Sequence, residues 1–311
     1  MQATCFAERV KHRLKREARS WRLWVMLLPA LCVLVLFRYG PMMGAQIAFR
    51  DYKAVKGIWG SNWVGLKHFV RFFNSDQFGL VIRNTLVLSL YTLIAGFPIP
   101  LLLALMINSC PNTALKKVTQ TVTYAPHFIS EVVLCGMIFI FTASNTGIIS
   151  KLYEALTGRQ APLFMGDPSY FSHIYVWTGI WQHMGWNSII FVAALAGVSP
   201  DLYEAAVIDG ATKLQQVRHI DLPSILPTAV TLLILNCGSL MSVGFEKALL
   251  LQNSLNISAS QIISTYVYNT GLTGGQFSFA SAVGLFNSVV NLILILLVNS
   301  VARKLNDTSL W

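Results

Sequence analysis

Six long apolar segments constrain this chain of 311 residues more than any other feature of its sequence. Each is close to the roughly 20 residues that an α-helix needs to cross a bilayer, and none alternates as a membrane β-strand would. Only 12% of the residues are charged, whereas a soluble domain carries about a quarter. The sequence therefore predicts an all-α polytopic membrane protein. Its six transmembrane helices are expected at about residues 22–39, 84–108, 118–141, 172–197, 226–251 and 280–302.

The distribution of basic residues predicts the orientation. Lys and Arg are enriched in the cytoplasmic segments of membrane proteins. With a cytoplasmic N-terminus, segments 1–21, 109–117, 198–225 and 303–311 lie inside, and together they hold more Lys and Arg than the outer segments. We therefore expect a basic cytoplasmic segment at 1–21, a transmembrane domain at 22–302 and a short cytoplasmic tail. A cleaved secretory signal is the alternative for the first span, but no small-residue cleavage site follows it.

A polar loop between the fourth and fifth spans, at about residues 199–223, carries the most specific pattern. Ser199 is a typical N-cap, and Pro200 suits the first position of a helix. Gly210 suits the left-handed conformation that ends a helix. A second short helix follows and is expected to stop at Pro223. The loop should therefore form two short amphipathic helices that meet at a bend and lie parallel to the membrane.

The composition of this loop favours contact with another protein. Ala205 and Ala206 allow a partner surface to approach closely, and Glu204 offers an acceptor for a basic residue or an exposed helix terminus. Helices that lie on lipid place Lys and Arg on their polar face, whereas anionic lipid repels acids. The acids of this loop are Asp201, Glu204, Asp209 and Asp221. A helix lying on lipid headgroups is the alternative.

The chain lacks motifs for nucleotide chemistry. It has no G-x-x-x-x-G-K-[ST] phosphate loop, so it is not expected to bind ATP in the usual way, and any energy from ATP would have to come from another chain. No Ser/His/Asp, metal-binding or paired-carboxylate cluster stands out, which argues against an enzyme. The five cysteines have no metal or redox spacing. We therefore expect no catalytic residues and no cofactor or metal ion on this chain.

The spacing of Glu204-Ala205-Ala206, Gly210, Ile220 and Leu222-Pro223 resembles the coupling loop of permease subunits of bacterial ATP-binding-cassette importers. Further segments resemble permeases for complex carbohydrates, in the polysaccharide group that includes lipopolysaccharide-type and alginate importer subunits. These segments are 124–130, 181–186, 265–272 and 275–286. The resemblance covers roughly residues 21–311, and the coupling loop is its most specific part.

The resemblance implies the type I importer permease fold, in a cell membrane, and a part in importing an oligosaccharide or polysaccharide fragment. It also implies three kinds of partner: a second related permease, two copies of a cytoplasmic ATPase that binds ATP and Mg²⁺, and an extracellular solute-binding lipoprotein. Closure of the ATPase dimer would push on the loop and turn the spans from inward-facing to outward-facing. The residues that it assigns to coupling are Tyr203, Glu204, Ala205, Ala206, Asp209, Gly210, Ile220, Leu222 and Pro223.

Polar and aromatic residues within the spans are candidates for the sugar path, because polar groups there are costly and often functional. The candidates are Trp177, Trp181, Gln182, Trp186, Asn187, Glu131, Asn236 and Glu246. Each has an alternative role. Glu131 could pair with a basic residue of the partner permease, and Glu246 with its neighbour Lys247. The tryptophans could anchor or pack, and Asn236 could bond one helix to another.

Some functional alternatives stay open. The chain could be the permease of an importer for a non-sugar solute. It could also be an ion-coupled secondary transporter, which predicts paired broken helices and no cytosolic docking loop. The first outer segment is unusually basic, which fits solvated charge, an acidic patch on the lipoprotein or an anionic glycan. Its basic residues are Arg38, Arg50, Lys53, Lys56, Lys67, Arg71 and Arg83.

Overall fold

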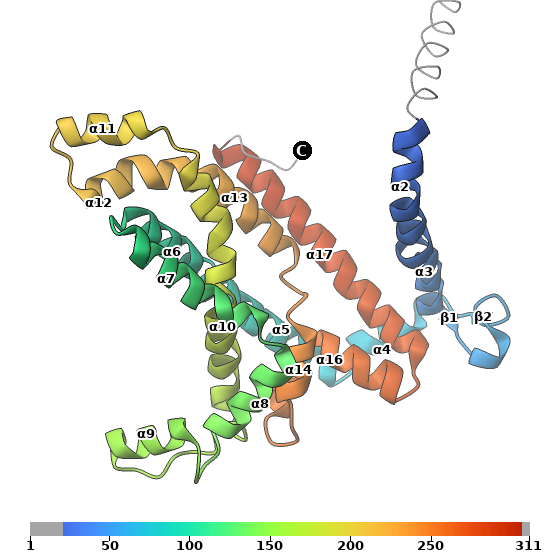
Figure 1. Cartoon of the computed structure of the whole chain (residues 1–311). Helices are drawn as coiled ribbons and strands as arrows, with labels where there is room; N and C mark the ends of the chain where they lie inside the picture. The colour runs from blue at the N-terminus through green and yellow to red at the C-terminus, as the bar shows by residue number, and fades with distance from the viewer. Residues whose placement is uncertain (1–20, 307–311) are drawn as a thin grey trace, which may run out of the picture. The chain divides into compact units, whose positions relative to one another are not determined.

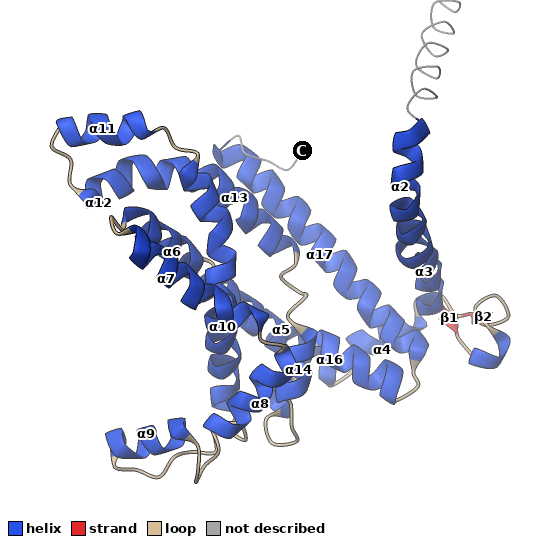
Figure 2. Ribbon diagram, in the orientation of Figure 1, coloured by secondary structure: helices blue, strands red, loops and turns tan. Residues whose placement is uncertain are grey.

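The computed structural model describes residues 21–306. The chain divides into two compact units, the first ending at Lys67 and the second beginning at His68. Each unit is described by itself (Figures 1 and 2). The predicted basic N-terminal segment, apart from its last residue, and the end of the predicted tail lie outside the described residues.

The described part of the first unit begins with a long apolar helix. This helix consists of α2 (Trp21–Leu34), the π-turn η1 (Val35–Tyr39), α3 (Gly40–Met42) and the 3-10 helix η2 (Met43–Phe49). Pro29 lies inside α2 without ending it. The apolar stretch from Leu23 to Phe49 is long enough to cross a membrane, so the first span extends beyond its predicted end at residue 39.

A small hairpin follows in the first unit. Strand β1 (Arg50–Asp51) pairs antiparallel with β2 (Asn62–Trp63), and η3 (Ala54–Lys56) lies between them. The Arg50 guanidinium lies 5.6 Å from the Trp63 ring centroid and donates through Nη1 to the Ser61 carbonyl at 2.9 Å. The cation–π contact and the hydrogen bond hold the two short strands together.

All the regular secondary structure in the described residues of the second unit is helical. Its longer helices are α5 (Gln77–Gly96), α6 (Pro98–Ser109), α7 (Thr113–Tyr124), α8 (Glu131–Phe141), α10 (Pro168–Ala196), α13 (Leu222–Gly238) and α17 (Phe277–Asn306). Its shorter elements are α4 (Lys67–Phe73, which starts at the boundary), η4 (Ala125–Phe128), α9 (Ile148–Thr157), α11 (Pro200–Ile208), α12 (Lys213–Gln216), η5 (Val217–Asp221), α14 (Phe245–Leu251), α15 (Ile257–Ser260), α16 (Ile263–Tyr268) and η6 (Asn269–Thr273).

The described residues contain four helices long and apolar enough to cross a membrane, or up to six spans if each of two bent pairs counts as one. The predicted all-α class is confirmed. The third predicted span, 118–141, is one of the bent pairs, with an angle of 97°. Pro126 lies in the turn η4, and Ser130 then caps the new helix α8 by accepting from the Val133 N–H. The Ile129 carbonyl at the bend accepts a hydrogen bond from Gln182 Nε2 at 2.9 Å. A side chain of α10 thus bonds a backbone carbonyl that the break in the helix leaves free.

The fifth span differs from its prediction. It was expected at 226–251, but the continuous helix runs from Lys213 to Gly238. A non-helical turn follows before α14. Asn291 of α17 supports this turn, because its Oδ1 accepts from the Met241 N–H at 3.0 Å and its Nδ2 donates to Ser242 Oγ at 2.9 Å. A side chain on a neighbouring helix thus replaces the helical hydrogen bonds that are lost.

Helix α10 lies at the centre of the second unit, packed against α5, α6, α7 and α13. Buried side chains such as Leu88, Phe171 and Val176 fill the space around it. Gly185 is required where α10 meets α7, because a Cβ there would lie 2.1 Å from the Thr123 carbonyl oxygen. Small residues allow such close approach of membrane helices. In Figure 1, α11 and α12 lie at one end of this unit and α9 at the other.

Candidate functional site

The first candidate site is the loop formed by α11, α12 and η5. Ser199 caps α11, with its Oγ accepting from the Asp201 N–H at 3.3 Å. Gly210 has a φ of +73°. Its N–H donates to the Val207 carbonyl, and the Ala211 N–H donates to the Ala206 carbonyl at 2.8 Å. This is the Schellman pattern of a helix that ends in a left-handed residue, as the sequence predicted for Gly210.

The predicted stop at Pro223 is wrong. Thr212 caps α12 through a capping box with Gln215, and the helix then continues through the π-turn η5 into α13. In η5 the Leu222 N–H donates to the Val217 carbonyl, five residues back. Such a turn is wider than an α-turn, which makes room for the Pro223 ring and its missing N–H. The loop therefore contains one short helix and the first turns of the fifth span.

An exposed apolar surface covers the outer side of this loop. Ile208 is 86% exposed and Leu214 77%, and Leu202 and Val207 are exposed beside them. Glu204, Ala205 and Asp209 are also exposed. Large apolar side chains with acids around them suit contact with another protein. The surface of Leu202, Glu204, Ala205, Val207, Ile208, Asp209 and Leu214 is called the docking surface below.

Asp221 does not belong to the acidic face on which the sequence placed it. Only 2% of it is exposed. Its Oδ1 accepts from the Tyr203 hydroxyl at 2.5 Å and from Asn108 Nδ2 at 3.2 Å. Lys116 Nζ donates to the Asn108 carbonyl at 3.1 Å. These contacts join α11, η5, α6 and α7, so the docking surface is held to the bundle by polar bonds.

The environment of Tyr203 favours its protonated form. Burial raises the pKa of the Tyr203 hydroxyl above its usual value, and the hydrogen bond to the Asp221 carboxylate acts in the same direction. A cavity of about 230 Å³ lies beside this group, lined by residues that include Ser109, Lys213 and Gln216. No local pattern pointed to the part played by Asn108, which is far from the loop along the chain.

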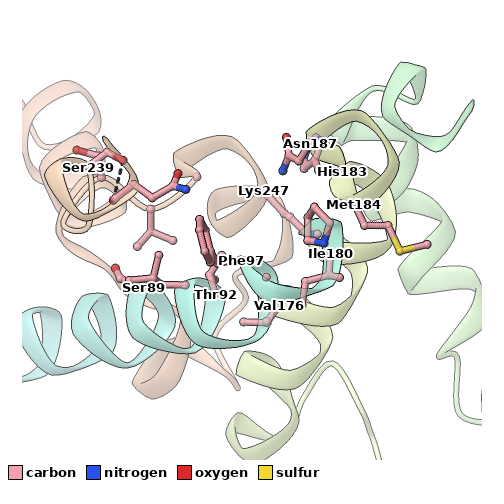
Figure 3. Close-up of a pocket in the computed structure, with 18 of the residues that line it drawn as sticks. Ser89, Thr92, Phe97, Val176, Ile180, His183, Met184, Asn187, Ser239 and Lys247 are labelled. Carbon is pink, nitrogen blue, oxygen red and sulfur yellow. Dashed lines mark hydrogen bonds between the residues drawn. The ribbon is translucent and has the colours of Figure 1, made fainter. Parts of the chain in front are cut away.

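The second candidate site is a cavity of about 590 Å³ inside the second unit. It lies between α5, α8, α10, the end of α13, the turn 239–244 and α14, and Figure 3 shows lining side chains from several of these elements. Four of the eight predicted path residues line it. These four are Glu131, Asn187, Asn236 and Glu246.

The other four path candidates are not among the lining residues of this cavity. They are Trp177, Trp181, Gln182 and Trp186. Trp177 donates through Nε1 to the Tyr91 hydroxyl at 2.8 Å, and Trp186 stacks on His127 with centroids 4.3 Å apart. Gln182 supports the bend of the third span, and Trp181 is exposed. Their contact with a sugar therefore stays a prediction without support from this cavity.

The cavity holds a buried amine that the sequence did not assign to a site. Lys247 is 5% exposed, and among the described residues its Nζ has no hydrogen-bond partner. Glu131 Oε1 lies 3.8 Å from His183 Nε2, and its Oε2 has no partner within the described chain. The ion pair suggested for Glu246 and Lys247 is not found among the residues that the structure describes. In the sequence, this buried amine was indicated by a lone lysine within an apolar segment, because ionisable residues in such segments are often functional.

Comparison with known proteins gives a consistent result. Residues 96–307 match the family described as binding-protein-dependent transport system inner membrane component. Protein LplB of Bacillus subtilis is 43% identical over 96% of this chain and 92% of its own length. The polygalacturonan/rhamnogalacturonan transport system permease protein YteP of the same organism is 41% identical over 98% of this chain and 94% of its own.

Solved structures agree with these sequence matches. A chain of a bacterial ABC transporter involved in the import of the acidic polysaccharide alginate superposes with a TM-score of 0.87 and 39% identity, covering 94% of this chain and 99% of that chain. A second structure shows the bacterial alginate transporter in complex with a periplasmic protein that holds an alginate pentasaccharide, again with a TM-score of 0.87. The fold of the described chain is therefore that of an ABC importer permease.

Proposed function

Because this chain belongs to the family of binding-protein-dependent transport system inner membrane components, we propose that it is the permease subunit of an ATP-driven importer of oligosaccharides or polysaccharide fragments. It forms the translocation path together with a second, related permease. The relatives named for polygalacturonan, rhamnogalacturonan and alginate transport support a carbohydrate as the substrate. An ion-coupled transporter would not need the docking surface, and it lies outside this family.

The docking surface is the observation that carries this proposal. It combines exposed apolar residues and acids on a short helix whose two ends are fixed by a cap and a glycine. Tyr203 ties this helix to Asp221, at the start of the fifth span. A force applied to α11 would therefore reach α6, α7 and α13 through bonded groups and not through a flexible linker.

The remaining parts of the assembly follow from this role. Two cytoplasmic ATPase subunits bind ATP and Mg²⁺ and seat on the docking surface, and an extracellular solute-binding lipoprotein delivers the sugar. Both termini are cytoplasmic. In support, the C-terminal end of α17 lies at the same end of the second unit as α11 and α12 (Figure 1). This arrangement agrees with the excess of basic residues in the inner segments.

Gly210→Val tests the coupling role. A β-branched residue in the left-handed conformation costs about 1–2 kcal/mol, which favours a rearranged end of α11 by about tenfold. Sugar uptake and substrate-stimulated ATP hydrolysis should both fall by about that factor in vesicles that contain the complete importer. Glu204→Lys reverses an exposed charge of the docking surface and should lower the same two rates.

The matched control is Gly158→Val. Gly158 also has a positive φ, +65°, also follows a helix end and also has open space where a Cβ would lie. It ends α9, at the other end of the unit from the docking surface (Figure 1). The backbone cost is the same, but transport should stay near the wild-type rate. Equal loss of transport in the two variants, or normal transport in Gly210→Val, would refute the coupling role of α11.

A further inference from the structure

The amine of Lys247 is buried in the cavity between α5, α10 and α14 without a hydrogen-bond partner among the described residues. Removing an ammonium group from water is expensive unless an opposite charge and hydrogen bonds replace the water. Lysine is also a flexible residue that could reach solvent elsewhere. A buried position facing a cavity therefore needs an explanation other than the packing of its aliphatic chain.

The surrounding residues hold this amine in place. Nζ lies 5.2 Å from the ring centroid of Tyr175, and the hydroxyl of that ring donates to the Gly244 carbonyl at 3.1 Å. One turn further along α10, Gly179 leaves the space that the amine uses, because a Cβ there would lie 3.2 Å from Nζ. Tyr175 and Gly179 thus form a cradle on one face of α10. The ammonium is fixed by an aromatic face on one side and open to the cavity on another.

The two acids that line the same cavity, Glu131 and Glu246, are not hydrogen-bonded to the amine. Neither Glu131 nor Glu246 forms an ion pair with Lys247 within the described chain. Glu131 Oε1 lies 3.8 Å from Nε2 of His183. The other ring nitrogen of His183, Nδ1, is 3.1 Å from Nδ1 of His127. Glu246 is exposed. The cavity therefore offers a buried amine that no described group hydrogen-bonds, together with an acid that has one carboxylate oxygen without a partner.

We propose that Lys247 binds the carboxylate of a hexuronate unit as an acidic oligosaccharide passes through this cavity. The proposal rests on the importer function above and names the class of its substrate. The carboxylate supplies the charge and the hydrogen-bond acceptors that the buried amine lacks. Asn187, Asn236 and Ser239 line the cavity with amide and hydroxyl groups, which suit the sugar hydroxyls.

The direct test measures binding of trigalacturonate and of its methyl ester to the reconstituted permease pair with its ATPases, without the binding protein. Saturation-transfer NMR titrations report both affinities. Wild type should favour the free acid by about tenfold to a hundredfold, the range expected for a charged hydrogen bond. Lys247→Met should lose this preference and keep its affinity for the ester. Lys247→Arg keeps the charge and should retain most of the preference.

Gly179→Ala adds a methyl group against the amine and changes no charge. It should lower the preference for the acid severalfold and leave the ester unaffected. Gly284→Ala is the matched control, because Gly284 is also a helix residue and has nothing within 4 Å of the added carbon. It should bind both ligands as wild type does.

The double variant Lys247→Met/Glu131→Gln separates substrate binding from an internal role. If Lys247 served only to neutralise Glu131, removing both charges would restore binding of the acid and overturn the proposal. Equal affinity of wild type for acid and ester would overturn it as well, as would equal loss of both ligands in Lys247→Met. If the importer carried neutral sugars only, the hexuronate proposal would fail and the importer function would stand. An absence of uptake of any sugar would count against that function itself.

Discussion

Tyr203→Phe should loosen the attachment of the docking surface to the helix bundle. The substitution removes one hydroxyl and little volume. Its effect therefore reports mainly on the bond that this hydroxyl donates to Asp221, together with the longer bond of 3.4 Å that it accepts from Asn108 Nδ2. A hydrogen bond to a charged group contributes about 1.5–3 kcal/mol. Asp221 keeps its second bond, from Asn108 at 3.2 Å, so we expect the lower part of that range. At 2–4 °C per kcal/mol for a domain of this order of size, the midpoint of thermal unfolding should fall by roughly 3–6 °C.

The pH dependence of this difference follows from the raised pKa of Tyr203. A group whose pKa is raised by folding stabilises the folded state below its unfolded pKa, here about 10 for tyrosine. That contribution disappears as the pH rises through the folded value. The difference between wild type and Tyr203→Phe should therefore be constant from about pH 6 to 9 and shrink above pH 10.

The assay is size-exclusion chromatography of the heated, purified importer, combined with ATP-driven uptake in vesicles. Uptake should fall together with stability, because α11 transmits less force to α6 and α13 when its tie to Asp221 is lost. Tyr170→Phe is the control, because this half-buried tyrosine hydroxyl has no hydrogen bond within the described residues. An equal loss in both variants, or a difference that grows above pH 10, would refute the reasoning.

Two further predictions concern packing in the second unit. Gly185→Ala should prevent α10 from approaching α7, because the new carbon would lie 2.1 Å from the Thr123 carbonyl oxygen. The yield of folded protein should drop sharply by chromatography, whereas Gly136→Ala, with open space at its Cβ, should fold normally. Asn84→Ala removes two hydrogen bonds to carbonyl groups between α14 and α16. At about 1 kcal/mol each, the midpoint of unfolding should fall by several degrees, and an unchanged midpoint would contradict the role of Asn84.

The local signals of the sequence predicted the conformation of the loop after the fourth span well up to Gly210. Ser199 and Gly210 act within a few residues of themselves, so their cap and left-handed conformations depend little on distant parts of the chain. Local reasoning was wrong at Pro223. Proline normally stops a regular α-helix, but the π-turn before Pro223 avoids the clash between its ring and the preceding turn. No pattern in the neighbouring residues predicted that π-turn.

The boundaries of the third and fifth spans needed the tertiary structure. Hydropathy measures only how apolar a segment is, so the bend near Ile129 and the turn after Gly238 are invisible to it. Both breaks are possible because a distant side chain, Gln182 or Asn291, bonds the freed backbone groups. The cavity depended on the fold in the same way. It brings Glu131, Asn187 and Asn236 together, whereas the three tryptophans and the glutamine proposed on α10 do not line it.

By itself, the sequence determined that this chain is a bundle of membrane helices with a polar, capped loop after the fourth span. Segment length, charge content and capping residues are properties of neighbouring residues, and they suffice for such statements. Only the tertiary structure decided that Asp221 is a buried anchor and that Lys247 is a buried cation. The state of an ionisable side chain is set by the groups packed around it, and in this chain those groups come from other helices.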